Sequence, residues 1–326
     1  MTESKPRVTI IGLGLIGTSM GLALQTSELV EQIVGHDKNR LASNQAKSLG
    51  AVDKVDWNLV SACERADLVI LAIPLDAIEP TLAAIGPDLR RGCVVMDTAS
   101  IKQPVLAAAA RTLPEGVHFV GGNPIPGRTI EGSGTEGARA DLFRGGVFCV
   151  VPAARTDGSA VKLVSDLVTV LGATPLFLDA VEHDGLLAGV DHLPGLVALA
   201  LLEMTTGQPT WRELRKMAGP AFEVATRAGS GDGASQAAVY HANRENLLRW
   251  LDSLSGTLRE VRRMVAEDST ELAEHLTKAE AERQSWLADW QVGRWQEGPG
   301  TEMPERPGLL EGFLGGFIRR PDKRER

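Results

Sequence analysis

The stretch that decides the fold of this chain lies near its amino terminus and reads Arg7-Val-Thr-Ile-Ile-Gly-Leu-Gly-Leu-Ile-Gly17. The β-branched run at 8–11 predicts a strand over 7–11, and the apolar, helix-forming residues of 15–27 predict a helix. Three glycines with G-x-G-x-x-G spacing stand between strand and helix. A strand, a glycine-rich turn and a helix in this order are the context that a dinucleotide-binding turn requires.

Each glycine of this turn has its own physical role. Gly12 permits the tight turn at the end of the strand, and Gly14 lets a pyrophosphate approach the backbone. Gly17 lets the helix pack closely against the strand. Leu15 and Ile16 belong to the start of the helix, whose unpaired N–H groups attract phosphates. We therefore predict that these five residues bind a dinucleotide.

A carboxylate at the end of the second strand favours NAD as that dinucleotide. The strand predicted at 32–36 ends in Asp37, which follows Gly17 by twenty residues. Asp37 can accept hydrogen bonds from the adenosine ribose, and it would repel the 2′-phosphate of NADP. Lys38 and Arg40 follow at once and would offset part of that repulsion, so NADP is the weaker alternative.

Short β-rich runs and helical stretches alternate up to residue 152, which predicts βαβ units with right-handed connections. The predicted fold class is α/β, with a Rossmann-type, doubly wound parallel sheet in a dinucleotide-binding domain over residues 1–152. The strand at 68–73 should end at the cofactor, so that Ile73 and Pro74 face the nicotinamide. The other strands are expected at 93–97, 118–121 and 147–151, and the other helices at 39–49, 57–64, 76–87 and 101–112.

After residue 152 the pattern becomes helical. Helices are expected at 159–172, 183–206, 210–228, 235–267 and 269–292, with one short strand near 174–178. A helical segment does not extend a parallel sheet, so we predict a separate all-α domain at 153–292. The remaining residues, 293–326, are rich in glycine and proline and are predicted to form a disordered tail.

Composition excludes several classes of function. The net charge of the 326 residues is −8, whereas a general nucleic-acid binder needs a basic face. Three cysteines, Cys63, Cys93 and Cys149, lack the spacing of a metal or redox site, and we expect buried, reduced thiols in a cytoplasmic protein without a metal. No signal-peptide core is present, and no segment reaches the roughly 18 uninterrupted apolar residues that indicate a membrane span.

Five further segments resemble the prephenate/arogenate (cyclohexadienyl) dehydrogenase family. They are the D-x-x-S-x-K turn at 97–102, the glycine-rich loop at 121–127, the closing segment from Leu142 to Pro152, the histidine motifs at 182–184 and 191–195, and the pattern at 225–227, 243 and 246–247. Together with the dinucleotide turn, this resemblance covers nearly the whole predicted folded part of the chain.

The resemblance implies NAD-dependent oxidative decarboxylation of prephenate or arogenate, a step of tyrosine biosynthesis. The substrate is a small dianionic cyclohexadienyl acid, which passes a hydride to the nicotinamide, loses CO2 and becomes aromatic. The same resemblance implies that Ser100 forms a hydrogen bond with the substrate hydroxyl and that Arg227 binds a substrate carboxylate. The structural alternatives are an N-cap at Ser100 for a helix starting at Ile101, and a surface arginine at 227.

The chain departs from the family pattern at four positions. Asn123 stands where the family has the loop histidine that accepts the hydroxyl proton, and an asparagine cannot take up a proton near neutral pH. Gly195 replaces the second histidine of the H-L-P-H motif, and Gln236 replaces a tryptophan. A two-residue shift is needed to bring Glu131 onto the glutamate of the family's loop.

These departures leave three explanations open: a rescued base, a related or otherwise altered substrate, or a homologue that binds dinucleotide without turnover. The candidate bases are His183 and His192, and the alternative for His192 is a buried core histidine. On a straight helix, with about 100° per residue, residues nine apart face opposite sides, so the two histidines are not expected to act as a pair. A β-hydroxyacid-type dehydrogenase is a further alternative, but residues 183–206 lack its catalytic lysine.

An apolar stripe runs along the helix expected at 235–267 with three- and four-residue spacing. It indicates either an internal core or a subunit interface, and the family resemblance implies a homodimer through the helical domain. The stripe consists of Leu247, Leu248, Trp250, Leu251, Leu254, Leu258, Val261 and Met264.

Overall fold

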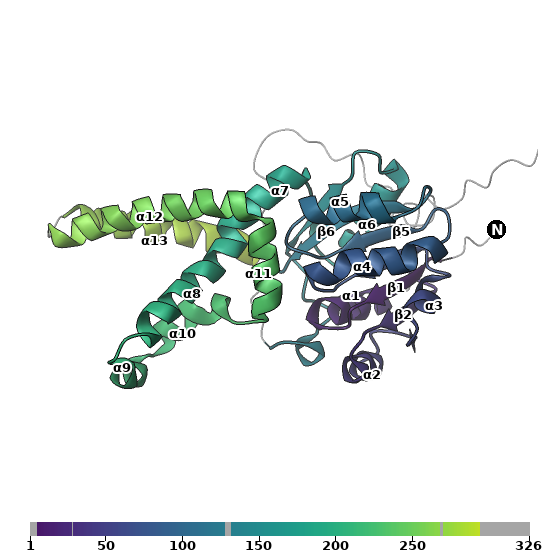
Figure 1. Cartoon of the computed structure of the whole chain (residues 1–326), viewed down its shortest axis with the longest axis horizontal. Coiled ribbons are helices and arrows are strands. Elements are labelled where there is room, and N and C mark those ends of the chain that lie inside the picture. Colours follow the sequence, from purple (N-terminus) through teal and green to yellow (C-terminus); the bar gives the residue numbers. More distant parts are fainter. Residues whose placement is uncertain (1–4, 28, 128–131, 268–269, 294–326) are drawn as a thin grey trace, which may run out of the picture. The chain divides into compact units, whose positions relative to one another are not determined.

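The computed structural model describes residues 5–27, 29–127, 132–267 and 270–293, and Figure 1 labels its elements. The chain divides into two compact units. Unit 1 comprises residues 1–179 and 283–326, and unit 2 comprises residues 180–282.

Unit 1 is built on one eight-stranded sheet with the strand order β3-β2-β1-β4-β5-β6-β7-β8. The order reverses between β1 and β4, and such a switch point opens a crevice at the carboxyl ends of the strands. The strands are β1 (Arg7–Ile11), β2 (Gln32–His36), β3 (Lys54–Val55), β4 (Leu68–Leu71), β5 (Val94–Asp97), β6 (His118–Ile125), β7 (Val147–Pro152) and β8 (Thr174–Phe177).

Helices cover both faces of this sheet, as a doubly wound fold requires. α1 (Leu15–Gln25), α2 (Arg40–Ser48) and α6 (Gly158–Val170) contribute to one hydrophobic core, and α3 (Leu59–Cys63), α4 (Leu75–Ile85) and α5 (Gln103–Thr112) contribute to a second. Alternate residues of β4 point into the two cores, because successive side chains of a strand leave opposite faces. Leu68 and Ile70 join the first core, whereas Val69 and Leu71 join the second.

Two features of the sheet differ from the prediction. The strands β1 to β6 are parallel, but β7 runs antiparallel to β6 and β8 runs parallel to β7, so the sheet is mostly rather than wholly parallel. β3 was not predicted at all, because two residues are too short to show a period of two.

The boundary predicted at residue 152 is also wrong. α6 packs its buried face, which includes Leu163 and Leu167, into the first core, and β8 extends the sheet at its edge. Unit 1 therefore continues to Asp179 before unit 2 begins. The amphipathic pattern of α6 fits a helix on a sheet as well as a helix in a bundle, so local sequence did not reveal its partner.

Unit 2 is helical. It contains α7 (Ala180–Leu187), a π-helical turn (Ala188–His192), α8 (Leu193–Thr206), α9 (Trp211–Met217), α10 (Pro220–Thr226), a 3-10 turn (Arg227–Gly229), α11 (Gly233–Ala242) and α12 (Arg244–Ala266). α13 (Glu271–Val292) begins in unit 2, and its residues from Arg283 onwards belong to unit 1. The predicted helix at 210–228 is broken before Pro220, and that at 235–267 is broken at Asn243.

The helices of unit 2 bury few of their own side chains. α9, α10, α11 and α13 contain no buried residue, and both large hydrophobic cores of the described residues lie in unit 1. The continuous helical segment Ala180–Thr206 is long and apolar enough to cross a membrane by length and composition, and 28% of its most apolar window is buried. The predicted tail lies outside the described residues except for Gly293.

Candidate active site

The glycine-rich turn of unit 1 has the local geometry that its spacing predicts. Gly12 has a φ of +92°, and a Cβ atom there would overlap the carbonyl oxygen of Ala72. A Cβ atom at Gly17 would overlap the carbonyl oxygen of Gly12, which shows how closely α1 approaches the turn. At Gly14, by contrast, a Cβ atom would meet no atom within 4 Å. The backbone beside Gly14 is thus open to a ligand.

Asp37 is held beside this turn at the end of β2. Its Oδ2 accepts a hydrogen bond from the backbone N–H of Leu13 at 2.7 Å, and its Oδ1 accepts one from that of Asn39 at 2.7 Å. The guanidinium of Arg40 lies over the indole ring of Trp57, 5.2 Å from the ring centroid. Of the two cations that were expected to offset the charge of Asp37, Lys38 and Arg40, the second is therefore engaged with an aromatic ring.

The remaining predicted cofactor residues lie at the ends of the two central strands. Leu15 and Ile16 open α1, with Gly14 at the N-cap position. Ile73 follows β4, and Pro74 is the N-cap residue of α4. Because β1 and β4 are neighbours in the sheet, both helix starts flank the switch point.

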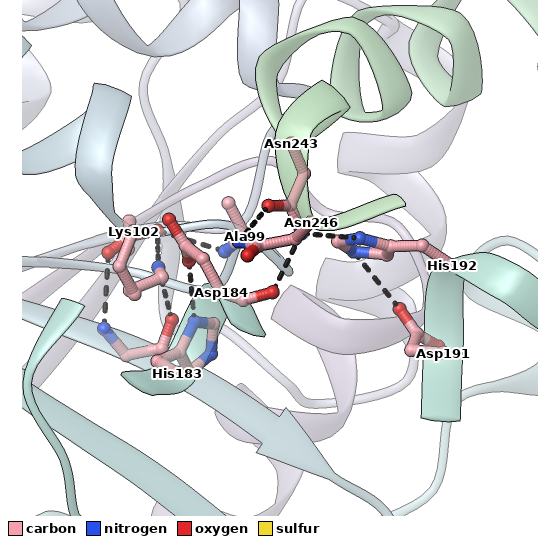
Figure 2. A network of polar contacts seen from close by, with 10 residues as sticks. Ala99, Lys102, His183, Asp184, Asp191, His192, Asn243 and Asn246 are labelled. Carbon is pink, nitrogen blue, oxygen red and sulfur yellow. Dashed lines mark hydrogen bonds and ion pairs between the residues drawn. The ribbon is translucent and has the colours of Figure 1, made fainter. Parts of the chain in front are cut away.

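A buried ion pair joins the D-x-x-S-x-K turn to the glycine-rich loop within unit 1. Lys102 and Asp97 are fully buried and paired, and the Nζ of Lys102 also donates to the carbonyl oxygen of Gly122 at 2.7 Å. The Oδ1 of Asp97 accepts from the backbone N–H of Gly122 at 3.1 Å, and its Oδ2 accepts from that of Ala99 at 2.9 Å. Figure 2 draws Lys102 and Ala99 among the polar contacts. Sequence reasoning quoted Lys102 as part of a motif but assigned it no role.

This ion pair lies next to two of the three predicted catalytic residues of unit 1, Ser100 and Asn123. Ser100 follows the turn that Asp97 closes, and it does not cap α5, because α5 begins at Gln103 with Lys102 at the N-cap position. The alternative of an N-cap for a helix starting at Ile101 is therefore wrong. Asn123 is buried in β6, directly after the Gly122 that Asp97 and Lys102 hold. Glu131 lies outside the described residues.

Unit 2 contains a network of buried polar side chains, which Figure 2 shows. The Nδ2 of Asn243 donates to the carbonyl oxygen of Asp184 at 2.7 Å and lies 3.1 Å from the Nδ1 of His192. The Oδ1 of Asn243 accepts from the Nδ2 of Asn246 at 2.8 Å. The Nδ1 of His183 lies 2.8 Å from the Oδ1 of Asp184. Asn243, which sequence reasoning quoted but gave no role, therefore links the two histidine motifs.

The prediction that His183 and His192 lie on one straight α-helix is wrong. The five-residue π-helical turn Ala188–His192 interrupts the segment between His183 and His192, so the angular spacing of a regular α-helix does not apply. Both side chains are buried and both contact the network around Asn243 and Asp184. The turn is covered by the ring of Trp250, which would overlap any side chain at position 189 and donates to the carbonyl oxygen of Gly185 at 3.3 Å.

The two ring nitrogens of His192 both have polar neighbours. An asparagine Nδ2 is a donor, so the Nδ1 of His192 is the acceptor of the contact with Asn243. The Nε2 then carries the proton and lies 3.6 Å from the Oδ2 of Asp191. The side chain of Asp191 is itself 55% exposed, whereas that of His192 is 2% exposed. His192 is thus a buried histidine within a hydrogen-bonded network.

Arg227 is exposed and lies directly after α10, in the 3-10 turn Arg227–Gly229. Its Nη2 and Nε donate to the two carboxylate oxygens of Glu223 at 2.7 and 3.0 Å. This pair raises the pKa of Arg227 and lowers that of Glu223, chiefly through the hydrogen bonds. The guanidinium is therefore presented in the two-pronged geometry that a carboxylate fits.

The other two departures from the family pattern lie on the same unit. The Nε2 of Gln236 donates to the carbonyl oxygen of Ser230 at 3.3 Å. Gly195 is buried on α8. Among the described residues, no group of three or more histidine, cysteine, aspartate or glutamate side chains could hold a metal ion.

Comparison with known proteins assigns both units. The family model for the nucleotide-binding domain of prephenate dehydrogenase matches residues 20–176, and the model for the dimerization domain of that enzyme matches residues 179–278. The chain belongs to the prephenate dehydrogenase family. The junction of the two matches agrees with the end of unit 1 at Asp179. Membership confirms the predicted family and fold class, and it makes the chain an oxidoreductase; the alternatives outside the family are not favoured.

Several members of the prephenate dehydrogenase family align over most of this chain. A cyclohexadienyl dehydrogenase from Zymomonas mobilis is 27% identical over 87% of this chain and 97% of its own length. A probable prephenate dehydrogenase from Streptomyces niveus is 31% identical over 81% and 71%, respectively. The crystal structure of Aquifex aeolicus prephenate dehydrogenase with hydroxyphenyl propionate and NAD+ has a TM-score of 0.79 and 26% identity, and covers 87% of this chain and 99% of that one.

Proposed function

We propose that this chain catalyses the NAD-dependent oxidative decarboxylation of prephenate or arogenate in tyrosine biosynthesis. The observation that carries the proposal is the match of both domains of prephenate dehydrogenase along residues 20–278, in a chain whose glycine turn and Asp37 have the geometry of a dinucleotide site. The related structure that contains NAD+ supports NAD as the cofactor. Asp37 supports it further, because a carboxylate at this point repels the 2′-phosphate of NADP.

The reaction places defined demands on the protein. A hydride leaves the ring carbon that bears the hydroxyl group and enters the nicotinamide, the hydroxyl proton goes to a base, and the electron pair of the bond to the carboxylate aromatises the ring as CO2 departs. Because aromatisation supplies the driving force, the protein mainly has to orient the substrate and accept one proton. Ser100 orients the hydroxyl, and Asn123, which cannot take up the proton, accepts a hydrogen bond through its carbonyl oxygen.

His183 is the base that we propose in place of the loop histidine. A carboxylate can only accept from the ring, so the contact with Asp184 assigns the proton to Nδ1 and leaves Nε2 as the basic nitrogen. A carboxylate that fixes the tautomer of a histidine in this way is a recurring arrangement for general-base catalysis. The Nδ1 of His192 accepts a hydrogen bond from Asn243.

Arg227 is proposed to bind a carboxylate of the dianionic substrate. The carboxylate of Glu223 now accepts two hydrogen bonds from the guanidinium. It would hold the Arg227 side chain in place until the substrate carboxylate replaces it. We expect Arg227→Lys to raise KM by about 10-fold or more, because a lysine keeps the charge but loses the paired hydrogen bonds. Lys216→Arg, a change of the reverse kind in an exposed pair with Glu213, serves as the control and should leave KM unchanged.

The test of the reaction is NADH formation from NAD with prephenate or arogenate in parallel. We expect turnover of at least one substrate, a loss of about 100-fold in kcat for His183→Gln and a much smaller change for His192→Gln. Asn123→His should restore part of the activity lost in His183→Gln. If neither substrate is turned over although NAD binds, the proposed reaction is wrong; if His192→Gln is the more damaging variant, the assignment of the base is wrong.

We also propose that the protein is a homodimer through unit 2. In the stripe on α12, Leu247 and Met264 are buried, but Leu248, Trp250 and Leu258 remain 51%, 41% and 58% exposed. The stripe is therefore not simply an internal core, and an exposed apolar surface of this kind marks an interface. The match to a dimerization domain supports a second copy as the partner and suits the apolar segment Ala180–Thr206 better than a membrane does. We expect a cytoplasmic protein and a solution mass of twice 34.8 kDa; a mass of one chain would contradict the dimer.

A further inference from the structure

The hydroxyl group of Tyr240 occupies the place of a side chain that α8 lacks. A Cβ atom built at Gly195 would overlap the Oη of Tyr240, which reaches α8 from α11. The phenol oxygen thus lies where any side chain at position 195 would begin. Gly195 is the position at which the family pattern has its second histidine. The Oη of Tyr240 therefore supplies a polar atom at this point of α8, from a different helix.

This point lies beside the other polar groups of unit 2. His192 is the N-cap residue of α8, and Gly195 follows it by three residues, so both lie on one side of the start of this helix. The rings of Tyr240 and His192 lie 6.2 Å apart between centroids, inclined at 59°. The same Cβ position at Gly195 also lies 3.4 Å from the carbonyl oxygen of Ala228, in the short turn that begins with Arg227. The hydroxyl therefore lies close to both the histidine motif and the turn that carries the arginine.

We propose that Tyr240 is a substrate-positioning residue whose hydroxyl group donates a hydrogen bond to a carboxylate of the substrate. This inference rests on the proposed function, and it adds a residue that replaces the missing histidine at position 195. A phenol is a neutral donor, so it contributes a hydrogen bond to an anionic ligand without adding a charge.

The surroundings keep this donor protonated. Burial, and in second place the negative charge of Asp191, raise the pKa of Tyr240 above its usual value. Among the described residues, His192 is a further titratable group beside the ring. Since the hydroxyl stays protonated throughout the neutral range, it can donate at any pH at which the enzyme works.

The first test is kinetic. We expect Tyr240→Phe to raise KM for prephenate or arogenate by about 10-fold or more, with kcat changed by less than about threefold, because a hydrogen bond to a charged group contributes in the ground state and the transition state alike. Gly195→Ala should raise KM as well, since its methyl group must displace the hydroxyl. In the double variant, phenylalanine leaves room for the methyl group, so Gly195→Ala should add little to Tyr240→Phe.

The second test measures the ionisation of Tyr240 directly, because Tyr240 is the only tyrosine of the chain. The tyrosinate absorbance band of the full-length protein therefore titrates one residue, and Tyr240→Phe supplies the baseline. Saturation with 3-phenylpropionate, a carboxylate with an aromatic ring and no phenol, should shift this titration to higher pH, because a bound acceptor stabilises the protonated phenol. A phenol that only packs against α8 would not respond.

The two tests separate the possible failures. An unchanged KM in Tyr240→Phe together with an unmoved titration would overturn the assignment of Tyr240 while leaving the reaction in place. A wild-type protein without turnover would count against the proposed function, yet the response of the titration to the carboxylate probe would still decide whether Tyr240 binds a carboxylate.

Discussion

Lys102 and Asp97 form an ion pair in which neither side chain has any solvent exposure. The lysine opens α5, the aspartate ends β5, and the Gly122 of the next strand is bound to both. The pair thus ties the turn that carries Ser100 to the strand that carries Asn123. A charge buried in this way is tolerated only while its partner remains, which gives the first prediction.

Lys102→Met should destabilise the protein by about 3–5 kcal/mol, because the carboxylate of Asp97 is left buried without its partner. The measurement is the free energy of unfolding in denaturant. Lys162→Met removes an exposed lysine paired with Asp166 and should cost less than about 1 kcal/mol. Adding Asp97→Leu to Lys102→Met should not restore full stability, since the N–H groups of Gly122 and Ala99 then lose their acceptor. Equal stability of the two lysine variants would show that the ion pair has no structural role.

Gly14 and Gly17 should respond differently to alanine. The alanine methyl group at position 14 meets no protein atom within 4 Å, so Gly14→Ala should fold normally and bind NAD at least about 10-fold more weakly. At position 17 it would overlap the carbonyl oxygen of Gly12, so Gly17→Ala should lose stability as well. Calorimetry of NAD binding and thermal unfolding separate the two effects. Gly158→Ala, at another open helix start, is the control; if it weakens NAD binding as much as Gly14→Ala, the turn is not the phosphate site.

Asp37→Ser should shift cofactor preference toward NADP. Removal of the carboxylate ends its repulsion of a 2′-phosphate, and we expect the ratio of KM for NADP to KM for NAD to fall by about 10-fold or more. Arg40→Ala should change this ratio little, because Arg40 lies over Trp57. The comparison requires steady-state kinetics with both cofactors. A large effect of Arg40→Ala would mean that its side chain leaves the indole to contact the cofactor.

The three thiols should be inert in the folded protein. Burial raises the pKa of Cys63 and Cys93 to about 12 and that of Cys149 to about 11, so almost no thiolate exists near neutral pH. All three cysteines are free and buried, as the sequence predicted. A chromogenic disulfide reagent should label none of them in the native protein within the time that labels all three in denaturant. Rapid labelling of one native thiol would reveal a local opening of unit 1.

Much of unit 1 could be predicted because its signals are local. The strand, glycine turn and helix at 7–25 are specified by residue types within a few positions of one another, and the structure has these elements where they were predicted. Asp37 could be named as a partner of the turn because strand length places it at the end of β2. The family motifs could likewise be read one segment at a time.

The amino-acid sequence by itself therefore determined the α/β class, the dinucleotide turn and the family, since these depend on period, spacing and motif. Tertiary structure alone decided the reversed direction of β7, the end of unit 1 at Asp179, the π-helical turn before His192 and the approach of Tyr240 to Gly195. Each of these depends on which surfaces meet across long sequence separations. A hydrophobic period of 3.6 or 2 residues shows that one face of a helix or strand will be buried. It does not show which other surface that face packs against, and only the tertiary packing decides this.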